Sequence, residues 1–90
     1  MNECFFIGKI IKNNGFKFIL NKKNKSKIEF ELKLIDNNIL KIVAYDEKAD
    51  FIFRNNFDIN DIVFIKGKIR TEHEKLIIVI NYIEKIFRKK

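Results

Sequence analysis

Hydrophobic and charged residues alternate along the middle of the chain. Every second position from Ile28 to Leu34 is apolar, and the positions between them carry Glu or Lys. This period of two predicts a strand with one buried face. The polar segment Asp36–Asn38 follows, and Asp and Asn favour turns because they tolerate a left-handed backbone and bond their own chain. With the segment Ile39–Tyr45 as the returning strand, the pattern predicts a β-hairpin.

The period changes after Tyr45. Residues at helical spacing then follow, mostly apolar, namely Ala49, Ile52, Phe53, Asn56 and Phe57. This spacing predicts a helix with one apolar face. We expect Asp46 to cap its N-terminus and Asn55–Asn56 to end it.

Two strands are predicted after the helix, at Ile62–Arg70 and Lys75–Ile86, and one before the hairpin, at Cys4–Ile11. The segment Gly15–Leu20 either continues the first strand or pairs with it after a turn at Asn13–Gly15. Three strands, one helix and two strands is the order of the OB-fold. The predicted fold class is therefore all-β with one helix, a five-stranded Greek-key barrel with the helix between strands 3 and 4.

Composition narrows the range of possible functions. Ninety residues are enough for one domain, residues 1–90, and 47% of them are apolar, which supports a compact core. The chain carries 19 Lys and Arg against 12 Asp and Glu, and this net charge of +7 favours a polyanionic partner such as nucleic acid. With one His and one Cys, the chain has few residues that could form a metal site or a nucleophilic triad. We therefore expect no cofactor, no metal and no enzymatic activity.

The cellular location is predicted from cysteine and from hydrophobic run length. Cys4 has no second cysteine to pair with, and a small buried thiol fits a reducing cytoplasm. The longest apolar runs are about five residues, far short of the ~20 that a membrane span needs. The N-terminus also lacks the pattern of a secretory signal.

Three segments resemble the bacterial single-stranded DNA-binding protein family. Asn2–Ile10 (NECFFIGKI) is similar to the family's opening strand, with its glycine at Gly8. Ile42–Ala49 (IVAYDEKA) is similar to the strand that ends in an aromatic residue and enters the helix, and Val63–Thr71 (VFIKGKIRT) resembles the signature strand. The resemblance implies an OB-fold that binds single-stranded DNA without catalysis, in replication, repair, recombination or mobile-element transfer.

The chain departs from the family pattern at three places. Ile39 stands where the family has a DNA-stacking Trp, the loops at Asp36–Asn38 and Arg70–Lys75 are short, and Phe87–Lys90 is basic where the family has an acidic tail. A minimal, tailless form is similar to the primosomal replication proteins related to this family. Two alternatives stay open: an OB-fold adaptor that binds proteins, and an RNA-binding protein similar to cold-shock domains, whose aromatic strand resembles Gly15–Ile19.

Unspecific binding of a single strand requires cations in line with exposed rings. One face of the strand Ile62–Arg70 is predicted to carry Phe64, Lys66, Lys68 and Arg70, about 6.5–7 Å apart. The opposite face of the same strand is predicted to carry Val63, Ile65 and Ile69. Glu29 and Glu31 argue against a phosphate track on the second strand.

Further binding candidates come from other segments. Tyr45 matches the family's stacking aromatic residue and shares a strand face with Lys41. The remaining candidates are two rings, two loop lysines and a hairpin histidine, namely Phe16, Phe18, Lys22, Lys23 and His73. Each of these residues also has an ordinary structural explanation, as a core ring or a solvated charge.

The first strand is apolar on both faces. Cys4, Phe6 and Ile10 alternate with a second apolar set, which is Phe5, Ile7 and Ile11. One barrel wall buries only one set, so the surplus predicts a homo-oligomer, either a dimer or a tetramer, with the second set in its interface. The family's pairing through the first strand implies the same.

Overall fold

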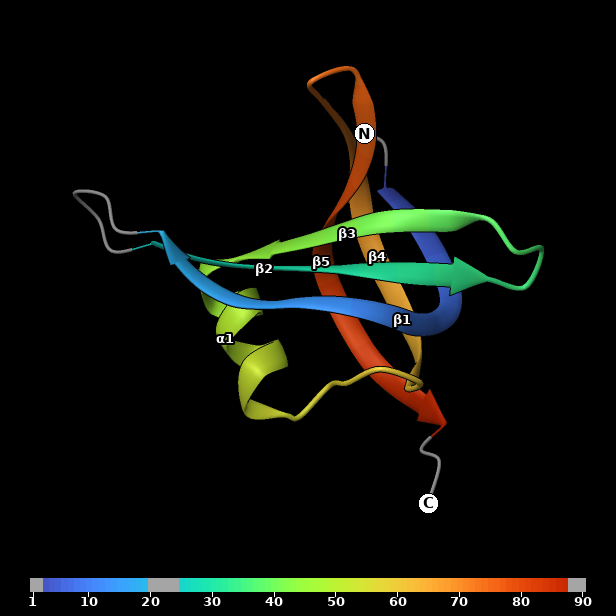
Figure 1. Ribbon diagram of the computed structural model, residues 1–90, viewed down its shortest axis with the longest axis horizontal. Helices are drawn as coiled ribbons and strands as arrows, with labels where there is room; N and C mark the ends of the chain where they lie inside the picture. Colours follow the sequence, from blue (N-terminus) through green and yellow to red (C-terminus); the bar gives the residue numbers. More distant parts are fainter. Residues whose placement is uncertain (1–2, 20–24, 88–90) are drawn as a thin grey trace.

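The computed structural model describes residues 3–19 and 25–87, and gives the backbone alone for residues 14–19, 25 and 87. Its elements in chain order are β1 Glu3–Ile19, β2 Lys25–Leu34, β3 Ile39–Tyr45, α1 Asp46–Arg54, β4 Ile62–Glu72 and β5 Lys75–Phe87. The strands form a closed barrel in the order β1-β2-β3-β5-β4 (Figure 1). Neighbouring strands are antiparallel except β3 and β5, which are parallel. The predicted OB-fold is confirmed.

β1 is long because it pairs with two strands, β4 and β2. Its first part, Glu3–Lys9, pairs with β4, and from Gly8 onward it pairs with β2. Figure 1 shows β1 bending between these two parts. A Cβ at Gly8 would lie 2.6 Å from the carbonyl oxygen of Lys33 and 2.8 Å from Cγ of Leu32. Only glycine lets the two strands approach this closely at the bend.

The predicted turn at Asn13–Gly15 is wrong, and the alternative of a continuous strand is right. β1 runs through these residues without reversing. Two irregularities in its pairing with β2, between Ile10 and Lys12 and between Asn13 and Phe16, each take up one extra residue of β1. Regular pairs on both sides keep the segment extended, so the polar residues bend the strand instead of reversing it.

The β2–β3 hairpin forms as predicted. The backbone N–H of Asn38 donates to Oδ1 of Asp36 at 3.1 Å, and the Asn38 amide donates to Oδ2 of the same carboxylate at 2.8 Å. Asn37 adopts the left-handed conformation with φ 71°. Ile35, at the tip, is fully exposed.

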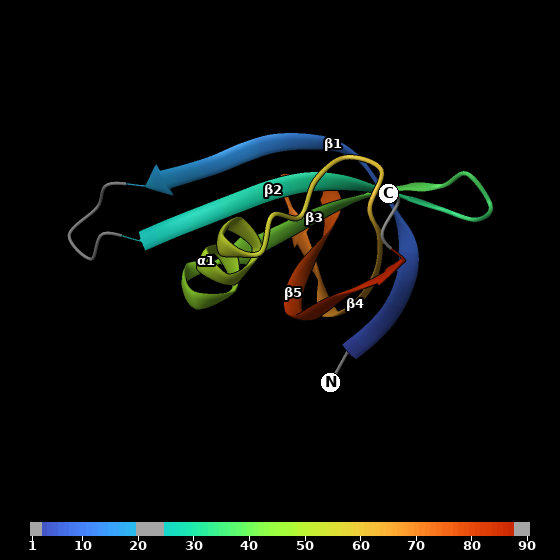
Figure 2. The same ribbon diagram turned by 90° about the horizontal axis from the view of Figure 1, so that it is seen from below.

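α1 covers one end of the barrel, where it contacts β2, β3 and β5. Figure 2 shows it against the ends of β2 and β3 that lie away from their connecting turn. Ala49 and Ile52 are its buried residues. The N-cap is Tyr45, which makes no side-chain cap hydrogen bond, and Asp46 lies in the first turn. The prediction of Asp46 as the cap is therefore wrong.

The helix ends at Asn55, as predicted, and so does not reach the last residues of its apolar spacing. Asn55 closes it, because its backbone N–H and its side-chain amide both donate to the carbonyl oxygen of Phe51, at 3.1 and 2.7 Å. Asn56 then turns the chain with φ 56°. Phe57 is buried from the following loop, whereas Phe53 is 62% exposed, so its predicted place on the buried face is wrong. A nine-residue helix buries only one short stripe.

Lys85 of β5 fastens the segment between α1 and β4. Its Nζ donates to the carbonyl oxygen of Asn56 at 3.0 Å and lies 3.6 Å from Oδ2 of Asp61. The same ammonium lies 5.0 Å from the ring centroid of Phe57. This cation therefore joins both ends of the loop to the barrel.

β4 and β5 extend beyond the barrel as a hairpin, which projects at the top of Figure 1. Val63 and Ile65 are buried in the barrel, but Ile69 is 40% exposed. Ile69 lies in the extension, which the other walls of the barrel do not cover. Its two-residue turn consists of His73 and Glu74, both left-handed with φ 51° and 64°.

We expect Glu74→Gly to stabilise the protein. A left-handed backbone costs a residue with a side chain about 1–2 kcal/mol, and glycine avoids that cost while losing more entropy on folding. The expected gain is about 0.5–1 kcal/mol in the free energy of unfolding, measured by urea denaturation. Glu72→Gly, within the paired strand, is the control and should lower stability. Equal effects at both positions would show that turn strain is not the cause.

Candidate nucleic-acid interface

The outer residues of β3, β5 and β4 form one surface, because the strand registers align them. Lys41 of β3 lies beside Ile77 of β5, which pairs with Arg70 of β4. Strands lie roughly 4.8 Å apart, so the two cations flank Ile77 at about twice that spacing. We call this surface the cationic face, and its residues are Lys41, Val43, Tyr45, Lys68, Arg70, Ile77 and Val79.

An apolar strip runs along the middle of the cationic face. Val43 is 1% exposed and Ile77 is 2% exposed, although neither belongs to the core cluster inside the barrel. Longer neighbouring side chains must cover them, and Lys41, Lys68 and Arg70 are themselves exposed. Lysine and arginine place their aliphatic stems on apolar surface while the charged ends stay in water. The cationic face thus combines exposed charges with an apolar layer beneath them.

Tyr45 lies within a small charged cluster at one side of this face. Lys27 of β2 is its cross-strand neighbour, and the Lys27 Nζ lies 5.9 Å from the centre of the Tyr45 ring. Oε2 of Glu29 lies 3.0 Å from the Nζ of Lys27 and 3.9 Å from that of Lys41. The hydrogen bond to Glu29 raises the pKa of Lys27 above its ordinary value, and burial opposes this only in part. Lys27 is therefore a firmly charged ammonium beside the ring.

A second surface lies on β1, β4 and β5. The rings of Phe5 and Phe64 stack with centroids 6.0 Å apart, and Phe64 meets the edge of Tyr82 at 6.2 Å. The Nζ of Lys66 lies 5.5 Å from the centre of the Phe5 ring. Ile7, which pairs with Phe64, is 56% exposed, and Phe5 is 61% exposed. We call these five residues the aromatic patch.

Tyr82 is held in the patch through its hydroxyl, which donates to Oε1 of Glu84 at 2.7 Å. This hydrogen bond to a carboxylate raises the pKa of the Tyr82 hydroxyl. The ring is still 46% exposed. The patch therefore offers three rings and an isoleucine to a partner surface.

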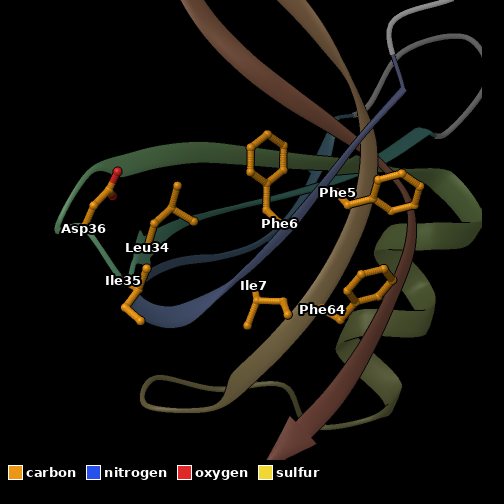
Figure 3. A pocket seen from close by; sticks show the side chains of 7 residues that line it. All are labelled: Phe5, Phe6, Ile7, Leu34, Ile35, Asp36 and Phe64. Atoms are coloured by element: carbon orange, nitrogen blue, oxygen red, sulfur yellow. The ribbon is translucent and has the colours of Figure 1, made fainter.

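The aromatic patch borders a groove of about 390 Å³ between β1 and the β2–β3 turn. Figure 3 shows Phe5, Ile7 and Phe64 on one side of it and Leu34 and Ile35 on the other. β2 pairs with β1 only from Gly8 onward. Within the described ranges, no strand pairs with the second edge of residues 3–7, so this groove runs along a free strand edge.

The structure brings part of the predicted binding set together. Lys41, Tyr45, Lys68 and Arg70 share the cationic face. Phe64 and Lys66 lie on the same face of β4 as predicted, but next to Phe5 and Ile7, the residues predicted to form an oligomer interface.

The other predicted residues are more scattered. His73 is exposed in the β4–β5 turn, and Ile11 is half-buried in β1. Phe16 and Phe18 lie opposite Ile28 and Ser26 in the β1–β2 ladder, and their side chains are not described. The candidates in the polar loop, Lys22 and Lys23, lie outside the described residues.

Sequence reasoning missed three features of these surfaces. It did not find the strip of Val43, Ile77 and Val79, because two of the strands that form it are joined only by tertiary pairing. It also did not place Tyr82 beside Phe64, since an irregularity in the β4–β5 register shifts the pairing near Lys66. The cluster around Glu29 follows from the hairpin register, which the turn at Asp36–Asn38 sets.

Residues 3–19 and 25–87 contain neither a metal-binding cluster nor a helix that could span a membrane. In these ranges no group of three or more His, Cys, Asp or Glu side chains is arranged to hold a metal ion. The one helix there is too short and too polar to cross a membrane.

Known structures share this architecture at low sequence identity. No protein-family model matches the sequence, and no curated protein sequence matches it. The SSB domain of a protein from Synechococcus sp. superimposes with a TM-score of 0.77 at 17% identity, covering 92% of this chain and 93% of that one. The single-stranded DNA binding protein from Thermus aquaticus gives 0.80 at 12% identity, covering all of this chain and 42% of the other.

A third similar structure has nearly the same length as this chain. The dimeric N-terminal domain of PriB from Thermoanaerobacter tencongensis gives a TM-score of 0.70 at 19% identity, and the alignment covers 97% of this chain and 98% of that one. The structural neighbours are thus SSB domains and PriB, and the chain has the OB-fold that these proteins share.

Proposed function

We propose that the protein binds single-stranded DNA, without catalysis, through the cationic face. The observation that carries this proposal is the row in which Lys41 and Arg70 flank Ile77, with Tyr45 on the same surface. Cations that follow a backbone and rings that stack on bases are the two parts of unspecific single-strand recognition. The net charge of +7 and the shared fold with single-stranded DNA binding proteins support it.

Each side chain of the cationic face has a role in this proposal. Lys41, Lys68 and Arg70 bind phosphates, and Tyr45 stacks on a base. His73 lies at the end of the β4–β5 hairpin, where it can contact the strand as it leaves the barrel. Duplex DNA hides its base faces in the stack, so only a single strand can use both the cations and the ring.

We further propose that the aromatic patch is the interface of a homo-oligomer, in its smallest form a dimer. Phe5 and Ile7 are more than half exposed, and β1 offers a free strand edge next to them. A second copy related by a two-fold axis would cover both the rings and the edge. A structural neighbour of the same length is itself described as dimeric. In such a dimer, Phe64 and Lys66 lie in the interface, and the cationic face binds the DNA.

The proposed cellular role is the protection or organisation of single strands in replication, repair, recombination or mobile-element transfer. The same surface could also hold RNA, because phosphates and base faces are common to both nucleic acids. A comparison of oligo-dT with oligo-rU therefore belongs to the test.

We expect labelled oligo-dT to bind with an affinity that falls with salt. Neutralising three to five phosphates predicts a slope of about −2 to −3.5 in a plot of log K against log salt, at ~0.7 per phosphate. Fluorescence anisotropy at several salt concentrations measures it. Lys68→Gln should flatten the slope by about 0.7, whereas Arg54→Gln, on α1, should leave it unchanged. Equal affinity for duplex DNA, or no binding of single strands, would overturn the proposal.

A further inference from the structure

Two acidic side chains of β2, Glu29 and Glu31, border the cationic face, and the first of them contacts its lysines. Glu29 of β2 is the cross-strand neighbour of Val43, so it lies between the pair Lys27–Tyr45 and the pair Glu31–Lys41. From this position its carboxylate lies 3.0 Å from the Nζ of Lys27 and 3.9 Å from the Nζ of Lys41. Lys27, which lies over the Tyr45 ring, and Lys41 are thus joined to one carboxylate.

The burial of the three side chains shows that this contact is held in place. The side chains of Glu29 and Lys27 are only 15% and 21% exposed, while that of Lys41 is 46% exposed. The carboxylate leans across the small Val43 towards β3, and Lys27 lies over the Tyr45 ring. A carboxylate placed between two ammonium groups at these distances occupies the position that a phosphate oxygen would take.

We propose that Glu29 competes with DNA phosphate for Lys27 and Lys41, and so limits the affinity of the cationic face. This inference rests on the proposed function. In the free protein the carboxylate holds both ammonium groups and keeps Lys27 over the ring of Tyr45. When DNA binds, a phosphate displaces the carboxylate, the two lysines turn towards the strand, and the ring becomes free to stack.

Glu31 provides a matched control within the same strand. It lies two residues further along β2 on the same outer face, and it is the cross-strand neighbour of Lys41. Among the described ion pairs of this face, none joins Glu31 to Lys41. Neutralising Glu31 therefore changes the net charge as much as neutralising Glu29 does, without releasing the paired lysines.

We expect Glu29→Gln to tighten oligo-dT binding about 5-fold at 50 mM salt and to steepen the salt slope by about 0.7 to 1.4, one or two phosphates' worth. Glu31→Gln should change affinity no more than about 2-fold and leave the slope unchanged. Lys27→Gln should weaken binding more in the Glu29→Gln background than in the wild type, because in the wild type Lys27 must give up its ion pair with Glu29 before it binds phosphate. Urea denaturation of each variant confirms that the folded protein is being compared, and Glu29→Thr replaces Glu29→Gln if the latter is unstable.

The outcomes separate this inference from the proposed function. If the wild type binds oligo-dT with the expected salt slope but Glu29→Gln and Glu31→Gln behave alike, Glu29 is no competitor and only this inference fails. A weaker affinity in Glu29→Gln would show that the carboxylate orders the lysines for DNA, which also overturns it. If neither the wild type nor Glu29→Gln binds oligo-dT, the proposed function itself is wrong.

Discussion

Ile7→Lys is expected to turn an oligomer into a folded monomer. Ile7 is 56% exposed on the outer face of β1 and lies beside Phe64, so the substitution adds a charge to the aromatic patch without touching the core. Full burial of an isoleucine is worth about 1.5–3 kcal/mol, and a two-fold interface would bury it twice. The dimer dissociation constant should therefore rise at least about 100-fold, as measured by sedimentation at tens of micromolar protein.

The same variant separates oligomerisation from DNA binding. Affinity for short oligonucleotides should be nearly unchanged, because the cationic face remains intact. Affinity for long oligonucleotides should fall, since two linked sites no longer act on one strand at high effective concentration. Ile59→Lys places the same charge at another exposed isoleucine, 48% exposed in the loop after α1, and should change neither property. A wild-type protein that sediments as a monomer at tens of micromolar would exclude this interface.

Tyr45→Ala is expected to weaken the binding of oligo-dT by about 1–3 kcal/mol, which is roughly 5- to 150-fold. Tyr45 is half-buried at the end of β3, and its ring already carries the ammonium of Lys27 at 5.9 Å. A base that stacks there contacts the ring face in place of this ammonium. Titration of each variant by fluorescence anisotropy measures the loss.

Tyr45→Phe is the control for this prediction. It keeps the ring and removes only the hydroxyl, so its affinity should stay close to that of the wild type. A purely structural role of Tyr45 predicts a different result: a lower midpoint of urea denaturation in Tyr45→Ala and the same affinity per folded molecule. Measuring both quantities on both variants distinguishes the two roles.

Most of the fold was predictable because the spacing of apolar residues along the chain, every second residue in strands and helical in α1, matches the local structure. The alternation from Ile28 to Leu34 and the turn at Asp36–Asn38 are local signals, and both are present in the structure. The errors arose where tertiary pairing overrides local preference. Asn13–Gly15 has the composition of a turn, yet its two flanks pair with β2 and hold it extended.

For the site, the sequence predicted which residues share a face within one strand, but not which strands lie beside that face. Alternation in β4 correctly placed Phe64, Lys66, Lys68 and Arg70 on one face. It could not show that the face is divided between two surroundings. Phe64 and Lys66 lie beside Ile7, Phe5 and Tyr82, whereas Lys68 and Arg70 lie beside Val79 and Ile77 of β5. That division depends on the closure of the barrel, which no local pattern in the sequence records.

The pairing of β1 with β4 also determines how the chain can fold. Glu3 lies opposite Lys68, so closure joins residues that are far apart in the sequence. The β2–β3 hairpin can form from neighbouring residues, whereas the barrel must wait until β4 and β5 have been synthesised. Until then both edges of the apolar segment around Phe5 and Ile7 are unpaired and open to association with other chains. Such long-range closure is slow, roughly milliseconds to seconds for small β-barrels, and the nascent chain passes through this stage each time it is made.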